Sequence, residues 1–301
     1  MKALYNFIYI TLIISSVFFL SLIYLPKPTG DEALKSFINQ DTQNTIESNV
    51  FHNNDDICVG DSLSFHKFNN IENLNQDDWN LIWQDEFENN CLDSGNWIIE
   101  DWAAEKNNEL QYYSPNNVKV DDGLLKLISK KEKFKGKDYT SGAVHTKGKV
   151  NFLYGKVEMR AKLPLGRGIF PAFWMLPDKE NIWLPEIDIM EMLGHQPNEV
   201  WMVSHWLGET GKLKSDFSNF KGPDFSKDFH TFSIEWTPDS ITWFIDDIER
   251  FRSTKFIPSE KMYLYLNTAI GGNWPGSPDY STIFPVNYEI DYVRIFKSNK
   301  E

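Results

Sequence analysis

Residues 232–245 read FSIEWTPDSITWFI, and this stretch decides the fold class. Phe232–Trp236 and Ile241–Ile245 are short, rich in residues that favour β-strands, and alternate in places between polar and apolar side chains. The four residues between them read as a turn, because Pro238 presets its own φ angle and Asp239 can bond its own backbone. The stretch therefore predicts a β-hairpin.

The same strand texture continues on both sides of this hairpin. Lys156–Lys162 (KVEMRAK) and Tyr263–Leu266 (YLYL) are further short segments rich in strand-forming residues. Residues 79–298 contain no long segment with a clean helical period and nothing that resembles a βαβ unit. We therefore expect an all-β sandwich of about 220 residues.

The chain before residue 79 reads differently. Residues 3–26 carry no charge and are mostly apolar, closer in length to the ~20 residues of a membrane-spanning helix than to a signal-peptide core of about 7–15. Residues 1–26 are thus expected to be an uncleaved anchor or a cleaved signal peptide, and both send the protein out of the cell. Residues 27–78, rich in Asn, Asp, Gln and Ser, are expected to be a polar spacer.

The two cysteines are Cys58, in the expected spacer, and Cys91, at the start of the expected domain. In an oxidising compartment they can pair and attach the spacer to the domain. Two unrelated thiols are the alternative, since spacing alone does not bring two Cα atoms within bridging range.

Composition limits the class of ligand. The 301 residues carry a formal net charge of −13, which disfavours nonspecific binding to nucleic acid and to other anionic polymers. Aromatic residues make up 15% of the chain, and the acidic residues are in excess. Flat aromatic faces combined with a few carboxylates suit a neutral carbohydrate.

The stretch with the clearest chemistry is residues 183–194, WLPEIDIMEMLG. Glu186 and Asp188 are two residues apart, so on a strand they share a face. Glu191 would point to the other side unless a β-bulge near Ile189–Met190 adds one residue. With that bulge, all three carboxylates face the same way.

Paired carboxylates of this kind suit glycoside hydrolysis, in which one is ionised and attacks while the other is protonated and donates. The common alternative is a solvated strand edge, where acidic residues usually lie. Two features argue against that edge. Apolar residues alternate with the acids, and four tryptophans flank the stretch: Trp174, Trp183, Trp201 and Trp206.

The segment EIDIME resembles the active-site signature of glycoside hydrolase family 16, in the bulged form of laminarinase-like endo-β-1,3-glucanases. Other stretches resemble family motifs in the family's order: Leu81–Phe87, Asn107–Tyr113, Tyr139–Gly142, Tyr154–Pro164, Pro171–Leu176, His230–Asp239, Gly271–Gly276 and Asp291–Phe296. The resemblance covers residues 80–297 and implies a β-jelly-roll sandwich of two antiparallel sheets with a concave substrate cleft. It also implies an endo-acting, retaining hydrolase of β-1,3-glucan.

By position, the resemblance makes Glu186 the nucleophile, Glu191 the acid/base and Asp188 the assisting carboxylate. It places five residues in sugar subsites: Trp102, Asn108, Trp183, His205 and Trp206. For the tryptophans the alternative is core packing, and for Asn108 it is a turn. A structural Ca²⁺, which some members hold, would match Glu86, a backbone oxygen near Gly123, and Asp291.

The sequence departs from the family pattern at two places. Pro185 stands where Gly commonly precedes the nucleophile, and Phe170 stands where Trp is frequent. The linkage cleaved therefore stays open, with mixed-linkage glucan, a galactan or transglycosylation as enzyme alternatives and noncatalytic glucan binding as the alternative of another class. Beyond the possible calcium we expect no cofactor, and we expect a monomer whose partner is a polysaccharide.

Overall fold

The computed structural model describes residues 57–58 and 78–299. The predicted anchor or signal segment and most of the predicted spacer lie outside these residues. In the described part, no helix has the length and apolar character needed to span a membrane. The only helical elements there are two short 3-10 turns, η2 (Lys106–Asn108) and η3 (Pro115–Asn117), so the all-β prediction is confirmed.

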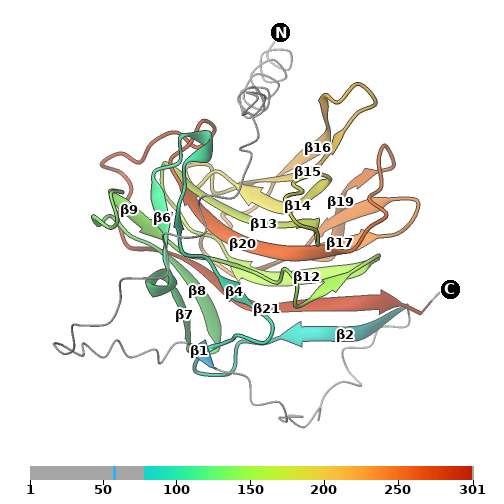
Figure 1. Cartoon of the computed structure of the whole chain (residues 1–301), viewed down its shortest axis with the longest axis horizontal. Coiled ribbons are helices and arrows are strands. Elements are labelled where there is room, and N and C mark those ends of the chain that lie inside the picture. The colour runs from blue at the N-terminus through green and yellow to red at the C-terminus, as the bar shows by residue number, and fades with distance from the viewer. Residues whose placement is uncertain (1–56, 59–77, 300–301) are drawn as a thin grey trace, which may run out of the picture. The chain divides into compact units, whose positions relative to one another are not determined.

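Two eight-stranded antiparallel sheets make up the fold, and both are curved (Figure 1). The first has the order β16 (Leu213–Lys221), β15 (Glu199–Leu207), β14 (Glu186–Met192), β13 (Ile169–Pro177), β20 (Met262–Ile270), β10 (Ala143–His145) and β4 (Ile98–Ile99), with β11 (Asn151–Phe152) also on β20. The second has the order β19 (Ile248–Ser253), β18 (Ile241–Ile245), β17 (His230–Trp236), β12 (Gly155–Lys162), β21 (Val286–Ser298), β8 (Leu124–Ser129) and β7 (Val118–Asp121), with β2 (Trp79–Asp85) also on β21.

The strands predicted from sequence are present. The hairpin of β17 and β18 pairs Phe232 with Ile245 and Trp236 with Ile241. The segment predicted as Tyr263–Leu266 is longer, because β20 runs from Met262 to Ile270. All nine of its residues are buried, so no polar alternation marks where this central strand ends.

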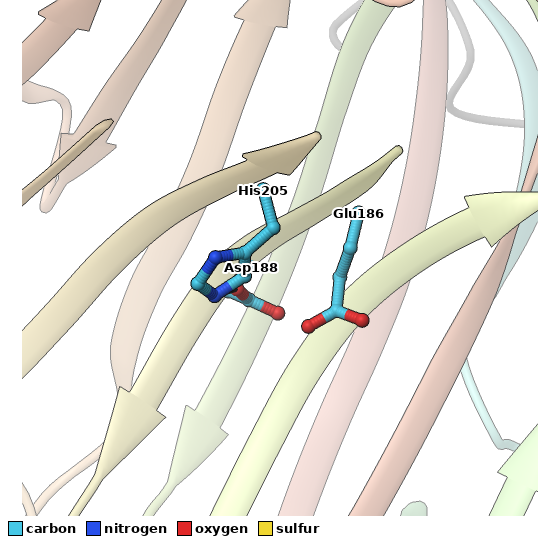
Figure 2. Close-up of side chains that lie close together, drawn as sticks. All are labelled: Glu186, Asp188 and His205. Atoms are coloured by element: carbon cyan, nitrogen blue, oxygen red, sulfur yellow. Dashed lines mark ion pairs between the residues drawn. The ribbon is translucent and has the colours of Figure 1, made fainter. Parts of the chain in front are cut away.

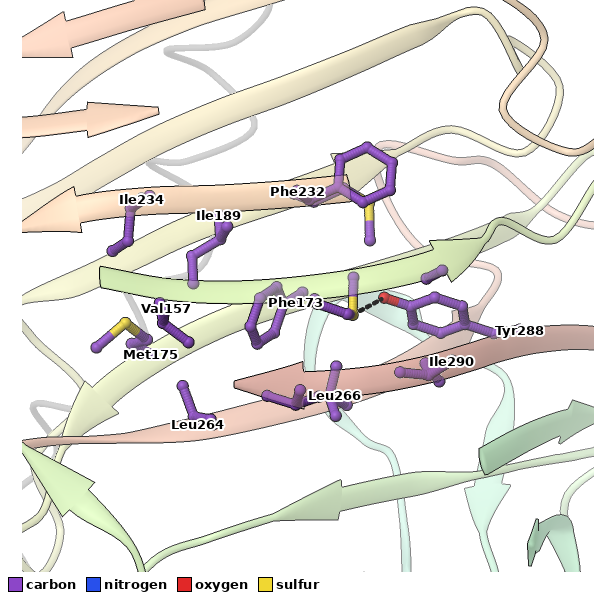
Figure 3. Close-up of a cluster of buried hydrophobic side chains, with 14 of the residues drawn as sticks. Val157, Phe173, Met175, Ile189, Phe232, Ile234, Leu264, Leu266, Tyr288 and Ile290 are labelled. Carbon is purple, nitrogen blue, oxygen red and sulfur yellow. Dashed lines mark hydrogen bonds between the residues drawn. The ribbon is translucent and has the colours of Figure 1, made fainter. Parts of the chain in front are cut away.

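The core lies between the two sheets, where their inward side chains interdigitate. Phe173 and Leu264 from the first sheet lie near Val157 and Phe232 from the second, and all four are fully buried (Figure 3). The one polar group drawn in this cluster, the Tyr288 hydroxyl, has a partner in the Met159 sulfur at 3.2 Å. This apolar layer fixes which side chains of the first sheet point away from the core.

Two smaller sheets contain the remaining strands of the described residues. One is a three-stranded sheet of β5 (Trp102–Ala103), β6 (Gln111–Tyr113) and β9 (Tyr139–Ser141). The other is the parallel pair of β1 (Ile57–Cys58) and β3 (Leu92–Asp93), so two residues of the predicted spacer form a strand. Cys91 is disulfide-bonded, and the only other cysteine of the chain is Cys58.

Candidate active site

The three carboxylates lie on β14, and the predicted bulge is confirmed. Neighbouring residues Phe173 and Trp174 of β13 pair with Met190 and Asp188, which leaves Ile189 without a partner on that strand. The ladder with β15 shifts at the same place. This extra residue returns the third carboxylate to the face of the other two.

Packing underneath holds the bulge in place. Ile187, Ile189, Met190 and Met192 are all buried in the core between the sheets. The indole of Trp243, on β18 of the other sheet, donates a hydrogen bond of 2.9 Å to the backbone oxygen of Asp188. Strand β14 is therefore fixed from the core side, and its three carboxylates point away from the core.

Figure 2 shows that Glu186, Asp188 and His205 converge. His205 lies directly opposite Glu186 in the ladder of β14 and β15, and its Nε2 is 3.4 Å from Oδ2 of Asp188. One ligand atom from each of the three residues lies within 4.8 Å of the others, and among the described residues this is the one group of three that could hold a metal ion. Of the predicted subsite residues, the structure thus places His205 at the carboxylates.

Burial shifts the pKa of all three carboxyl groups upward, and repulsion between charges adds to the shift at Asp188 and Glu191. Burial raises the pKa of Glu186 to about 7 and that of Glu191 to about 8, and a charge on Glu186 contributes to the second shift. The pKa of Asp188 is raised well above its usual range, by burial first and then by the charges of both glutamates. A hydrogen bond with Asp188 lowers the pKa of Glu186.

It follows that the first proton leaves Glu186, because a hydrogen bond with Asp188 favours the charged form of Glu186, whereas Glu191 has no such hydrogen bond and is opposed by the charge on Glu186. The resulting charge keeps Glu191 protonated. The cluster therefore holds one ionised and one protonated glutamate near neutral pH, which is the division of roles that two-carboxylate catalysis requires. Burial lowers the pKa of His205 to about 4, so its ring is neutral there.

The comparison with known families decides the identity. The model of Glycosyl hydrolases family 16 matches residues 105–294, which include all three carboxylates and more than half of the chain. The chain belongs to glycosyl hydrolases family 16. This membership accords with the jelly-roll-like sandwich, and the predicted fold class is confirmed.

Several relatives of this family 16 chain have been described. A "Beta-glucanase" of Rhodothermus marinus is 35% identical over 251 residues, covering 73% of this chain and 85% of the relative. "Glucan endo-1,3-beta-glucosidase A1" of Niallia circulans is 35% identical over 259 residues, covering 72% of this chain and 38% of the relative. The solved catalytic domain of an endo-1,3-β-glucanase (laminarinase) from Thermotoga petrophila RKU-1 is 37% identical, with a TM-score of 0.69 over 74% of this chain and 99% of that domain.

A second family model also matches this chain. It is described as Beta-glucan synthesis-associated protein SKN1/KRE6/Sbg1 and matches residues 1–180. The match overlaps the family 16 model from residue 105 onward and ends before Glu186. It therefore does not extend to the carboxylates.

The predicted aromatic subsite residues differ in how they are held. Trp183 is 49% exposed, with the Lys106 ammonium 4.0 Å from the centre of its ring. Trp102 is 36% exposed and packs edge-on against Tyr113. Trp206 stacks flat on Phe256, with 5.4 Å between ring centres. None of these three rings belongs to the core clusters of the described residues, so packing in the core does not account for them.

Asn108 lies in the turn η2, whose first residue is Lys106. Its side chain donates a 2.6 Å hydrogen bond to Asn273, and its φ is +58°. Asparagine tolerates this left-handed conformation better than most residues. Asn108 is therefore a turn residue, as the alternative interpretation expected, and its contact with sugar stays a prediction.

A row of side chains beside the carboxylates escaped sequence reasoning. Asp188 pairs with Trp174, Trp174 with Tyr265, and Tyr265 with His145, so the row crosses four strands on one face. Trp174 and Tyr265 have ring centres 4.7 Å apart, and His145 stacks on Tyr265 at 5.5 Å. Two signals in the sequence point to members of this row: Trp174 is one of the tryptophans near residues 183–194, and the alternation in YLYL places both tyrosines on the same face.

The predicted calcium ligands have other partners. Arg294 donates two hydrogen bonds, of 2.7 and 2.8 Å, to the carboxylate of Glu86. Arg160 donates to the carboxylate of Asp291, and Gly123 lies in a turn with a φ of +71°. A calcium ion would have to compete with an arginine at both carboxylates, so these residues as placed do not fit a calcium donor set.

Replacing Glu191 with glutamine is expected to stabilise the fold at high pH. Because the pKa of Glu191 is raised to about 8 in the folded state, its contribution to stability is full below the unfolded pKa of ~4.5 and is lost as the pH rises through about 8. Glutamine has no such loss, so the melting temperature of Glu191→Gln should exceed that of the wild type by several °C at pH 9 and equal it near pH 4.5. Thermal unfolding at both pH values checks this, and a gain that does not depend on pH would contradict it.

Proposed function

We propose that this family 16 chain is an endo-acting, retaining β-1,3-glucanase. The observation that supports this most directly is the bulged strand β14, which presents Glu186, Asp188 and Glu191 on one face. The carboxylate pKa order separates an ionised from a protonated glutamate. Relatives named as endo-1,3-β-glucanases support β-1,3-glucan as the substrate.

In this proposal the reaction takes two displacements. The carboxylate of Glu186 attacks the anomeric carbon, and the bond to the glycosidic oxygen breaks as Glu191 gives that oxygen its proton. A glycosyl ester on Glu186 results. Glu191, now ionised, takes a proton from water, whose oxygen attacks the anomeric carbon and releases Glu186. Asp188 stabilises the charge on Glu186 by donating a hydrogen bond to it.

The face of the first sheet that carries the carboxylates supports a sugar polymer as the ligand. Trp174 pairs with Asp188 on this face, and the ring of Trp183, 49% exposed, lies just before β14. Aromatic faces stack on the apolar faces of glucose units. We propose that the predicted subsite residues Trp102, Asn108, Trp183, His205 and Trp206 bind this polymer.

We further propose that the domain acts outside the cell as a monomer, secreted or held at the surface by residues 1–26. The apolar character of that segment supports the proposal, and so does the disulfide at Cys91, because disulfides persist in oxidising compartments. The net charge of −13 is compatible with a neutral polysaccharide partner.

A panel of polysaccharides tests the proposed substrate. Laminarin, mixed-linkage β-glucan, agarose and κ-carrageenan are each incubated with the wild type, and released reducing ends and product sizes are measured. We expect laminarin to be cut into short oligosaccharides whose new reducing ends are first formed as the β-anomer, as NMR would show. Preferred cleavage of another polymer would refute the substrate, and a first-formed α-anomer would refute retention.

A further inference from the structure

Ser215 on β16 is part of a cross-strand row that leads to the carboxylates. It lies opposite His205 on β15, which lies opposite Glu186 on β14. The hydroxyl oxygen of Ser215 is 2.6 Å from Nδ1 of His205. Since the other ring nitrogen, Nε2, is 3.4 Å from Asp188, the imidazole connects Ser215 to the carboxylate cluster.

Asp188 needs a donor at the oxygen that faces this ring. The residue is 2% exposed, and its Oδ2 is buried without a hydrogen-bond partner. Nε2 of His205 lies 3.4 Å from this oxygen and is a candidate donor. Catalytic hydrogen bonds are often long before substrate binds, so a separation of 3.4 Å does not exclude this role.

A neutral imidazole has one N–H, and its position decides the direction of the whole chain of hydrogen bonds. If Nδ1 carries the hydrogen, it donates to Ser215 and the lone pair of Nε2 faces Asp188. The proton of Asp188 is then drawn toward His205. If Nε2 carries the hydrogen, it donates to Asp188, and the proton of Asp188 is free to bond Glu186.

We propose that Ser215 is a positioning residue whose hydroxyl donates to Nδ1 of His205, fixes the Nε2–H tautomer and so directs the proton of Asp188 at Glu186. In this arrangement Ser215 donates to His205, His205 to Asp188, and Asp188 to the carboxylate that attacks. The inference rests on the proposed function, because the benefit of this order lies in stabilising Glu186 as a nucleophile.

Three variants test the inference. Ser215→Ala removes the donor, and Ser215→Thr keeps a hydroxyl at the same position. Ser218→Ala is the matched control, because Ser218 lies on the same strand but pairs with Met202, whose side chain is in the core. The readouts are the ¹⁵N NMR shifts of the His205 ring, assigned with His205→Gln, and kcat on laminarin.

We expect the Nε2–H tautomer in the wild type, Ser215→Thr and Ser218→Ala, with kcat within about twofold of the wild type. In Ser215→Ala we expect the Nδ1–H tautomer to become populated and kcat to fall roughly 10-fold, the effect of losing one hydrogen bond at a buried group. The KM should change little. An Nδ1–H tautomer in the wild type, or an unchanged tautomer and kcat in Ser215→Ala, would overturn the inference.

The NMR measurement needs no turnover, which keeps the two proposals separable. A wild type that cleaves no glucan would refute the proposed function. The tautomer of the His205 ring would still support or overturn the inference that Ser215 fixes the hydrogen on Nε2.

Discussion

Glu186→Ala is expected to lower kcat on laminarin by at least about 10³-fold, because no other described carboxylate can replace the attacking oxygen. Burial is the largest cause of the raised pKa values of Asp188 and Glu191, and it persists when Glu186 is replaced, so both carboxyl groups still favour their protonated form. Neither can then form the glycosyl ester. Reducing ends released by wild type and variant measure the loss. The matched control is Glu235→Ala, on β17 of the other sheet, which should retain full activity.

A small external nucleophile gives this variant a diagnostic product. Azide can occupy the space that alanine leaves and attack the anomeric carbon from the side of Glu186. The carbon–nitrogen bond forms as the glycosidic bond breaks, and Glu191 still protonates the leaving oxygen. The product should be the α-glycosyl azide, detected by NMR. A variant that kept wild-type activity, or that yielded the β-azide, would contradict the role of Glu186 as the nucleophile.

Local signals were sufficient to predict the hairpin and the bulge. The hairpin of Phe232–Trp236 and Ile241–Ile245 depends on a turn of four residues, and strand propensity fixed both arms. The bulge followed from spacing, because Glu191 could share a face with Glu186 only if one residue was added between them. Such features depend on residues that are close in the chain, at most the 13 positions between Phe232 and Ile245, so a single sequence contains the signal.

The neighbours of the carboxylates depend on strand order instead. Tyr265 and His145 reach the site because β20 and β10 lie next to one another in the first sheet, although 120 positions separate these two residues in the chain. Ser215 reaches His205 through the register of β15 and β16. Pairings between distant strands arise from the packing of the whole sandwich, and no periodicity in the sequence indicates them.

The partners of the predicted calcium ligands could not be predicted from the sequence for a related reason. Glu86 and Asp291 are oxygen donors of the right type, but the second sheet also brings Arg294 and Arg160 against them. An arginine that approaches from another position of a strand is not visible from the two acids alone. The residue types predicted oxygen ligands for a cation. The neighbouring strands decide that the cation beside each carboxylate is an arginine side chain.

Glu191→Ala is expected to lower kcat on laminarin by about 10²–10⁴-fold, the usual contribution of a general acid, while sparing substrates that need no proton. Dinitrophenyl β-laminaribioside should still react with Glu186, because its leaving group is a stable phenolate that needs no proton. The glycosyl ester should then accumulate, since no base activates water, and azide should resolve it to the β-glycosyl azide. Burst kinetics and NMR of the azide check both steps. If the burst rate with the aryl glycoside fell as far as kcat on laminarin, or if the α-azide formed, Glu191 would not be the acid/base.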